Sequence, residues 1–467
     1  MNPFLNPFFS ASIIKHYLTD INRAWKLSYD NLRKYQDKAL VKSLKYAYKI
    51  PAYKEKYSAA GIKISDINGI KDLQKLPLMT KAELIEGFPD KIIPPNFNKD
   101  AAYCVGTSGS SGRPVSIYKD NKYIMIEALG AIRQLKAYGL NWRKTKITNI
   151  GDFSLPSTTD EECLKKGLMK NLSPYFSLKN YQLLYTGEEP KKLLDQIEKF
   201  NPELIIGYTS VLMGLATLKN KGKGKAVRPK YIVSSGEVLD SYSREYIEEA
   251  FNSKVLNLYA TTEGGSIAFE CLNGNMHINS DFVHVELLDK NGKSVSENEF
   301  GSMVITRLFP GGTPIIRYTG LSDIGAFGSE DECDCGLHTP ILKSLEGRKK
   351  DAIVTPKGQI FPPATIPMPL AEATGKYNTY QIKRFQIIQK KIDEIEINVE
   401  IDEDQRDKKV KGEKLLKEIE QNYEKFLEEN MKVTVKEVKK VDLVKGSTSP
   451  PLIISKLDNK HIEKALL

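Results

Sequence analysis

The residues most suited to chemistry form a glycine- and hydroxyl-rich loop, GTSGSSGRP, at 106–114. Glycines let the backbone approach a ligand closely, and backbone N–H groups and hydroxyls together suit the oxygens of a polyphosphate. The loop lacks the Gly-Lys-Ser/Thr ending of a Walker A motif, and a flexible linker is the competing interpretation. Strand-like runs at 103–105 and 115–118 favour a loop within a sheet. The candidate phosphate-binding residues are Thr107, Ser108, Gly109, Ser110, Ser111 and Gly112.

Two further segments place carboxylates near predicted strand ends. In YATTEGG, residues 259–265, Glu263 follows the apolar run 255–258 and is well placed to hold Mg²⁺ beside phosphates. The segment RYTGLSD ends at Asp323 and is followed later by GRKKD, so an aspartate and an arginine are available for ribose hydroxyls or a phosphate. Taken singly, the segment with Glu263 fits a polar turn equally well, and the aspartate and the arginine are more often surface ion-pair partners.

A third set of residues combines sulfur and imidazole. Cys271 and His277 form a Cys-x₅-His fragment, and Cys333 and Cys335 form a Cys-x-Cys fragment further along the chain. Three thiolates and one imidazole complete a tetrahedral structural Zn²⁺ site without an open position. Glycines near both fragments let closely spaced ligands converge, with His338 as the reserve ligand. Buried reduced cysteines are the alternative interpretation.

Three regions with different sequence patterns surround these residues. Residues 1–100 are predicted to be mostly helical, with Thr80 and Glu83 forming a capping box. Between 100 and 340, short apolar runs alternate with helical stretches, which predicts an α/β domain with mixed sheets and helices. Alternating and helical periodicities over 380–440 predict a small C-terminal α+β domain. The predicted domains are 1–349 and 350–467.

The composition excludes several classes of protein. Hydrophobic residues make up 40% and charged residues 27% of the 467 residues, as in globular proteins that bury a core. The net charge of +10 attracts anionic substrates, but no Lys/Arg cluster with interleaved aromatic residues indicates nucleic-acid binding. No apolar run is long enough to span a bilayer, and the first residues do not resemble a signal peptide, so we expect a cytoplasmic protein without a membrane partner. Five cysteines in a chain of this length do not indicate a disulfide framework.

The order of the motifs is more specific than any one of them. TSGSSGRP, SSGE, YATTE, RYTGLSD and EGRKKD follow one another as in the adenylate-forming superfamily of acyl-CoA synthetases, which the chain resembles from about residue 40 to about residue 455. LPLMTK and EGGSIAFEC resemble the phenylacetate–CoA ligase branch. That branch includes capsular-polysaccharide CapK-type proteins and a synthetase that adenylates a deazaflavin coenzyme. The two cysteine fragments are similar to those of zinc-binding members.

The resemblance implies nucleotide-binding roles for residues in all of these motifs. The loop from Thr107 to Gly112 would wrap the β- and γ-phosphates of ATP, whereas Thr262 would contact the α-phosphate and Glu263 would bind Mg²⁺. The other implied positions are Gly236 and Glu237 along adenine, Tyr259 stacked near it, Asp323 and Arg348 on the ribose, and Lys350 at the hinge between the domains.

The activity implied by the resemblance is ATP-dependent adenylation of a small carboxylic acid, aryl or related, followed by transfer to coenzyme A. The small domain would act as a lid that rotates between the two steps. Two alternatives stay open: nucleotidyl transfer to a non-thiol acceptor, as in the deazaflavin-type or polysaccharide-related members, and a nucleotide-binding homologue with weakened catalysis. The identity of the acid and the formation of a homodimer are also open.

One departure from the family pattern concerns the lid. Family lids usually end with a Gly-Lys pair whose lysine bridges the carboxylate and the α-phosphate. The matching stretch here is 446–456, with Pro or Leu at the lysine position and Lys445 and Lys456 as the nearest substitutes. Losing one positioned donor at a developing charge costs about 3–4 kcal/mol. We therefore expect a slow first half-reaction and a second half-reaction that is spared.

Overall fold

The computed structural model describes most of the chain. The described residues are 7–106, 114–151, 178–289, 291–328, 333–348, 352–357, 359–361, 363, 365–377, 379, 381–403, 406, 410, 412–427, 431–442 and 452–457. Three sequence predictions lie outside this set: the phosphate loop 107–112, the hinge residue Lys350, and the segment 443–451 where the lid lysine was sought. These stay predictions.

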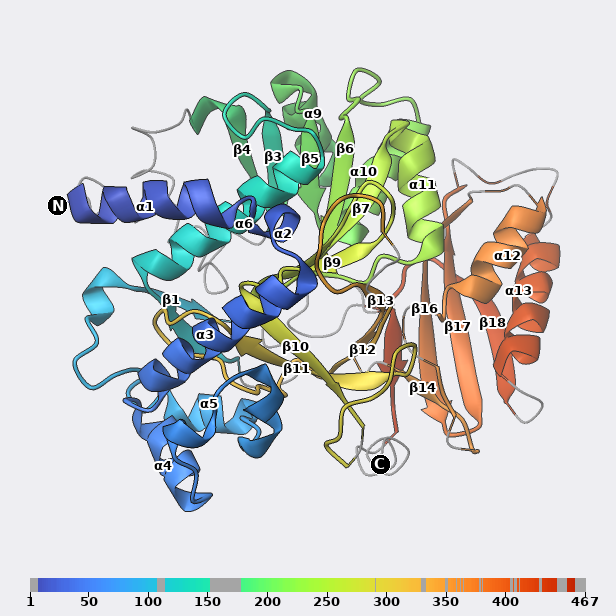
Figure 1. The fold of residues 1–467 in the computed structure, drawn as a ribbon. Helices are drawn as coiled ribbons and strands as arrows, with labels where there is room; N and C mark the ends of the chain where they lie inside the picture. The colour runs from blue at the N-terminus through green and yellow to red at the C-terminus, as the bar shows by residue number, and fades with distance from the viewer. Residues whose placement is uncertain are drawn as a thin grey trace.

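A seven-stranded mixed sheet organises the larger part of the molecule, in the order β4-β3-β5-β6-β7-β8-β9 (Figure 1). The first five strands in this order are parallel, and β8 and β9 continue the sheet in antiparallel pairing. The strands are β3 (Ile147–Gly151), β4 (Tyr181–Tyr185), β5 (Leu204–Gly207), β6 (Tyr231–Ser235), β7 (Lys254–Thr261), β8 (Gly265–Glu270) and β9 (Met276–Ile278).

Helices cover both faces of this sheet because its parallel strands are apolar on both sides. Ile205, Ile232 and Val255 pack on one face with α9, α10 and α11, while Val233 and Leu256 pack on the other face with α6. Neighbouring residues of one strand therefore enter different cores, as the two-residue period of a strand requires. The helices are α6 (Asn121–Ala137), α9 (Pro190–Phe200), α10 (Thr209–Asn220) and α11 (Ser241–Phe251).

The first hundred residues are mostly helical, as predicted. The Thr80 hydroxyl accepts a hydrogen bond from the Glu83 N–H at 3.3 Å, and the Glu83 carboxylate accepts one from the Thr80 N–H at 2.8 Å, so the predicted capping box is confirmed. The helical elements are α1 (Pro7–Asp20), α2 (Arg23–Lys26), α3 (Tyr29–Ala47), α4 (Pro51–Ala59), η2 (Ile64–Asp66), η3 (Ile70–Lys75), α5 (Lys81–Gly87) and η4 (Lys99–Ala101), with η5 (Leu178–Asn180) later in the chain.

Two smaller β units lie beside the main sheet. Strands β1 and β2 pair antiparallel and carry the phosphate loop between them, so the flanks of that loop are strands as predicted. A four-stranded antiparallel sheet follows in the order β10-β11-β12-β13. These strands are β1 (Tyr103–Gly106), β2 (Ser116–Lys119), β10 (Val283–Leu288), β11 (Gly301–Arg307), β12 (Asp323–Phe327) and β13 (Leu342–Arg348).

The C-terminal part contains a second mixed sheet in the order β18-β17-β16-β19, with α12 and α13 beside it (Figure 1). The alternating residues Ile395, Ile397 and Val399 of β17 are fully buried, and so are Ile419 and Tyr423 of α13. The predicted small α+β unit is therefore present. Its elements are β14 (Ile353–Val354), β15 (Ile360–Phe361), α12 (Met368–Tyr377), β16 (Ile382–Lys391), β17 (Glu394–Ile401), α13 (Gly412–Leu427), β18 (Lys432–Val438) and β19 (Ile453–Ser455).

The C-terminal unit packs against the α10–α11 side of the large sheet. The Tyr242 hydroxyl on α11 donates a hydrogen bond to the Ile382 carbonyl on β16 at 2.8 Å. Near the end of α10, Lys221 forms an ion pair with Asp402 at 2.8 Å. No helix in the described part of the chain is long and apolar enough to cross a membrane.

Candidate active site and metal-binding cluster

Glu263 lies in the turn that joins β7 to β8. The Gly264 N–H donates to the Thr261 hydroxyl at 2.9 Å, which tightens this turn. The Glu263 side chain is only 4% exposed, and the Tyr318 hydroxyl donates a hydrogen bond to its Oε1 at 3.0 Å. Burial raises the pKa of the Glu263 carboxyl, against the opposing effects of Tyr318, Lys81 and Lys119. A carboxylate in this position favours a cation as its neighbour, because burial is costly for an uncompensated negative charge.

A second contact joins the same two motifs. The Tyr259 hydroxyl on β7 donates a hydrogen bond to Asp323 Oδ2 on β12 at 2.5 Å. Backbone pairing also places Asp323 opposite Arg348 at the end of β13. The structure thus brings Tyr259, Asp323 and the Arg348 backbone together from three strands, although the Arg348 side chain lies outside the described set. This contact assigns a partner to the Tyr259 hydroxyl. The stacking of its ring near a base stays a prediction.

Gly236 and Glu237 follow β6 and have distinct local roles. Gly236 has a φ of +82°, and an added Cβ would lie 2.4 Å from Cε1 of Tyr208, so a side chain at this position would collide with the tyrosine ring. Glu237 accepts hydrogen bonds from the Ser210 N–H at 2.7 Å and from the Ser210 hydroxyl at 3.0 Å. Glu237 therefore stabilises the first turn of α10. Tyr208 packs over the glycine that is predicted to lie along adenine.

Tyr318 and Arg317 are functional or supporting residues that the motif analysis did not single out. Arg317 is buried with a φ of +46°, and its guanidinium donates to both Glu286 carboxylate oxygens at 3.0 and 3.1 Å. It also donates to the Leu76 carbonyl at 2.5 Å. Arg317 therefore anchors the segment that presents Tyr318 and Asp323. No local sequence signal pairs it with Glu286, because Glu286 lies on β10 and Arg317 lies in the segment between β11 and β12.

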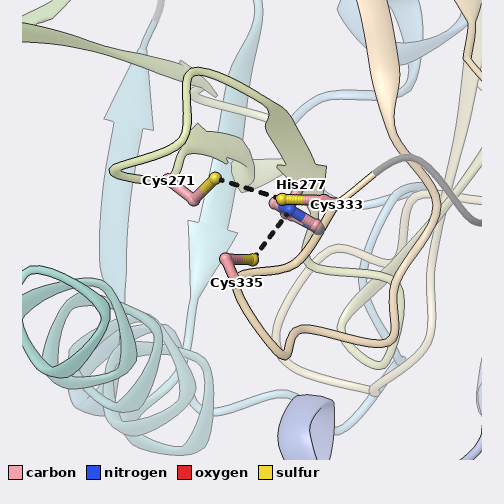
Figure 2. Close-up of side chains that lie close together, drawn as sticks. All are labelled: Cys271, His277, Cys333 and Cys335. Atoms are coloured by element: carbon pink, nitrogen blue, oxygen red, sulfur yellow. Dashed lines mark hydrogen bonds between the residues drawn. The ribbon is translucent and has the colours of Figure 1, made fainter.

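The four predicted metal ligands come together (Figure 2). The Cys271 and Cys333 sulfurs are 3.6 Å apart, and the Cys335 sulfur is 3.2 Å from His277 Nε2. All four ligand atoms lie within 4.8 Å of one another. The other imidazole nitrogen, Nδ1, lies 3.2 Å from the Thr339 hydroxyl, which orients the ring with Nε2 towards the sulfurs.

Two glycines and hydrogen bonds among the ligand side chains shape this cluster. Gly274 and Gly336 have φ values of +89° and +80°, so each cysteine fragment turns sharply, as predicted. The hydrogen bond with Cys335 lowers the pKa of the Cys271 thiol to about 3, with a further contribution from His277, while the pKa of Cys335 is raised. The reserve ligand His338 lies elsewhere, with its Nδ1 3.1 Å from the Leu27 carbonyl. The four side chains therefore lie together, whereas metal binding by them stays a prediction.

Comparisons with known proteins agree with the motif order. No family model matches the chain. Protein CapK of Staphylococcus aureus is 26% identical over 316 residues, which cover 67% of this chain and 66% of CapK, so the match spans just under two thirds of that relative. The phenylacetate–coenzyme A ligase of Thermus thermophilus is 23% identical over 391 residues, which cover 80% of this chain and 82% of the ligase.

The solved structures add information on the fold. A 2-hydroxyisobutyryl-CoA ligase in the postadenylation state, with 2-HIB-AMP bound, has a TM-score of 0.76 at 19% identity, over 95% of this chain and 94% of that one. The same ligase in its thioesterification state has a TM-score of 0.61.

The predicted α/β fold with a small C-terminal α+β unit is confirmed by this likeness. In both sequence and fold, this chain is thus similar to the adenylate-forming, phenylacetate–CoA ligase-like branch of enzymes.

Proposed function

We propose that this chain is an AMP-forming acid–CoA ligase, which activates a small carboxylic acid with ATP and transfers it to coenzyme A. The observation that carries the proposal is the double link between two motifs. Tyr259 and Glu263 of YATTEGG bond to Asp323 and Tyr318 of RYTGLSD, respectively. Together with the β1–β2 hairpin that carries the phosphate loop, this arrangement supports one nucleotide site.

The nucleotide would be held by residues from several elements. Asp323 is suited to accept hydrogen bonds from ribose hydroxyls, with Arg348 opposite it in the strand pairing. Gly236 leaves backbone exposed beside the Tyr208 ring, which suits the flat face of adenine. The loop 107–112 would bind the β- and γ-phosphates, and Thr262 would contact the α-phosphate.

Glu263 fits a role as the Mg²⁺ ligand, because it is a hard oxygen donor held in place by the Tyr318 hydroxyl. When bound, Mg²⁺ would neutralise charge on the phosphates. The protein's own contribution is to keep the carboxylate at the β7–β8 turn and to limit its contact with water, since the side chain is nearly fully buried.

The reaction divides into two half-reactions. An oxygen of the acid's carboxylate attacks the α-phosphorus of ATP and pyrophosphate leaves, which gives an acyl adenylate. The thiol of coenzyme A, losing its proton, then attacks the acyl carbon and AMP leaves. A lid rotation about Lys350 between these steps would have to break the Tyr242–Ile382 hydrogen bond and the Lys221–Asp402 ion pair.

We also propose that Cys271, His277, Cys333 and Cys335 bind one structural Zn²⁺. Tetrahedral zinc, with bonds of about 2.3 Å to sulfur and about 2.0 Å to nitrogen, separates its ligand atoms by about 3.5–3.8 Å. The distances of 3.6 Å between two of the sulfurs and 3.2 Å between sulfur and nitrogen are close to these values. The ion would tie the β8–β9 turn to the loop before β13. A cytoplasmic location and a homodimer stay predictions.

The test is ATP–pyrophosphate exchange measured over a panel of aryl, fatty, hydroxy and amino acids. This assay reports the first half-reaction without requiring the acceptor. Acid-dependent exchange, followed by thioester formation when coenzyme A is added, is the expected result. A stable product that still carries AMP would instead indicate nucleotidyl transfer, and nucleotide binding without exchange would indicate a homologue that has lost catalysis.

A further inference from the structure

A charged and hydroxyl-bearing group of side chains lies where β2 meets α6. Lys119 is the last residue of β2, and Tyr123 and Glu127 are four residues apart on α6, so they share one face of the helix. The Lys119 ammonium lies 3.1 Å from Glu127 Oε1 and 4.5 Å from the centre of the Tyr123 ring. We call Lys119, Tyr123 and Glu127 the α6 cluster.

The α6 cluster packs against the turn that carries Glu263. Gly265, which begins β8, pairs with Thr261 across the base of this turn. A Cβ added at Gly265 would lie 3.2 Å from Glu127 Oε1 and 3.2 Å from the Tyr123 hydroxyl. Lys119 also interacts electrostatically with Glu263. The cluster and the proposed magnesium ligand therefore belong to one site.

The strand pairing separates the α6 cluster from the phosphate loop. The loop leaves β1 at Gly106 and enters β2 at Ser116, which are paired. Lys119 pairs with Tyr103 at the opposite end of this hairpin, about 10 Å along the strand at about 3.3 Å per residue. The cluster thus lies at the end of the hairpin opposite the attachment points of the loop. If the loop holds the triphosphate, this end of the hairpin is available to the body of the acid.

Buried polar groups lie within and next to the α6 cluster. The Tyr123 side chain is fully buried, and its hydroxyl has no hydrogen-bond partner among the described residues. Arg307 lies 4.4 Å from the centre of the same ring, and its Nε and Nη1 have no hydrogen-bond partner within that set either. By contrast, the Glu127 side chain is 32% exposed, so its carboxylate is the member that a ligand can reach. Covering this charged carboxylate with an apolar group would be costly, which favours a polar ligand over an apolar one.

We propose that Glu127, oriented by Lys119, is a specificity-determining residue for an acid that carries a hydrogen-bond-donating substituent, either a hydroxyl or an amine. This inference rests on the proposed ligase function and deepens it by naming the substrate class. The Glu127 carboxylate accepts the hydrogen bond of the substituent. The Tyr123 hydroxyl lies beside it, because both oxygens are 3.2 Å from a Cβ built at Gly265. An unsubstituted aryl or alkyl acid would place an apolar group against this carboxylate and is therefore activated poorly.

The experiment compares matched acids in the pyrophosphate-exchange assay. One series is phenylacetate with its 4-hydroxy and 4-amino derivatives, and the other is propanoate with its 3-hydroxy and 3-amino derivatives. In wild-type protein, the best substituted acid should exceed its unsubstituted parent by about 10- to 100-fold in kcat/KM, as expected for a hydrogen bond to a charged group. Glu127→Leu should remove this preference. Glu127→Gln should reduce it more for a protonated amine than for a hydroxyl, which distinguishes the two substituents.

The control is Glu55→Leu on α4, an exposed glutamate on a helix remote from the cluster, which should keep the wild-type preference. Robust exchange that favours the unsubstituted acids, or a preference that survives in Glu127→Leu, overturns this inference and leaves the ligase proposal standing. No exchange with any acid overturns the ligase proposal and this inference together. The substrate series in wild-type protein tests the proposal without any variant. The inference can therefore be overturned even if Glu127→Leu fails to fold.

Discussion

A single methyl group at Gly236 should damage both folding and nucleotide binding. The residue has a φ of +82°, and L-residues in the left-handed region lose about 1–2 kcal/mol. The new Cβ would lie 2.4 Å from Cε1 and 2.7 Å from Cδ1 of Tyr208, and forced overpacking typically costs about 1–3 kcal/mol. We therefore expect Gly236→Ala to lose about 2–5 kcal/mol of stability. Displacement of the Tyr208 ring should also weaken AMP binding, since the ring lies beside Gly236, which is proposed to lie along adenine.

The two contributions can be separated by a double-mutant cycle in urea unfolding, with AMP binding measured by calorimetry. Tyr208→Ala combined with Gly236→Ala should recover the steric part but not the backbone part. Gly139→Ala is the matched control, because Gly139 has a φ of +66° but no atom within 4 Å of an added Cβ. Stability losses that are equal in Gly236→Ala and Gly139→Ala, or a cycle that is additive, would refute the steric reasoning.

Three other outcomes test the site and the lid. Glu263→Gln keeps the side-chain volume but removes its charge, so exchange at fixed MgATP should fall by about 100-fold or more, and an unchanged rate in folded protein would rule out the magnesium assignment. Cys333→Ser should reduce zinc from about one ion per chain to almost none and lower the melting temperature, whereas full zinc occupancy by elemental analysis would contradict the ligand set. Without the family lysine, adenylation should be slow but thioester formation from a presynthesised acyl adenylate should be fast, and Pro450→Gly with Pro451→Lys should raise the first rate. An ordinary adenylation rate that Lys456→Ala abolishes would show that another lysine has taken this role.

The Cys/His cluster was predictable because its geometry is mostly local. The Cys-x₅-His and Cys-x-Cys fragments are short, and Gly274 and Gly336 turn them sharply enough to bring their ligands together. Only the meeting of the two fragments needed the fold. That meeting follows from the contact in which His277 of β9 pairs with Ile341, the residue just before β13.

The contacts that orient the active-site carboxylates were not predictable in the same way. Motif order indicated Glu263 and Asp323 but not the hydroxyls that hold them, because Tyr318 lies between β11 and β12 and Tyr259 lies on β7, each far along the chain from its partner. Hydrophobic periodicity reveals which face of an element is buried, but it does not reveal which polar side chains meet across tertiary contacts. The buried Arg317–Glu286 pair escaped prediction for the same reason.

The fold was predicted at the level of layers and not of detailed pairing. Alternating apolar runs indicated a large sheet, and the two-residue and helical periods near the C-terminus indicated the small α+β unit. The antiparallel continuation through β8 and β9 depends on the short turn at Thr262–Gly264, and its role became clear only from the strand register. Likewise, the docking of the C-terminal unit through Tyr242 depends on one hydroxyl facing a backbone carbonyl, which has no sequence signature.

The central claim is that the carboxylate of an acid attacks the α-phosphorus of ATP and that a thiol then displaces AMP. The most direct measurement uses a substrate acid labelled with ¹⁸O in its carboxylate, together with ATP and coenzyme A, and follows the products by mass spectrometry. We predict AMP that carries one ¹⁸O atom, unlabelled pyrophosphate and the acyl-CoA thioester. ADP with labelled inorganic phosphate, or AMP without label, would contradict the account.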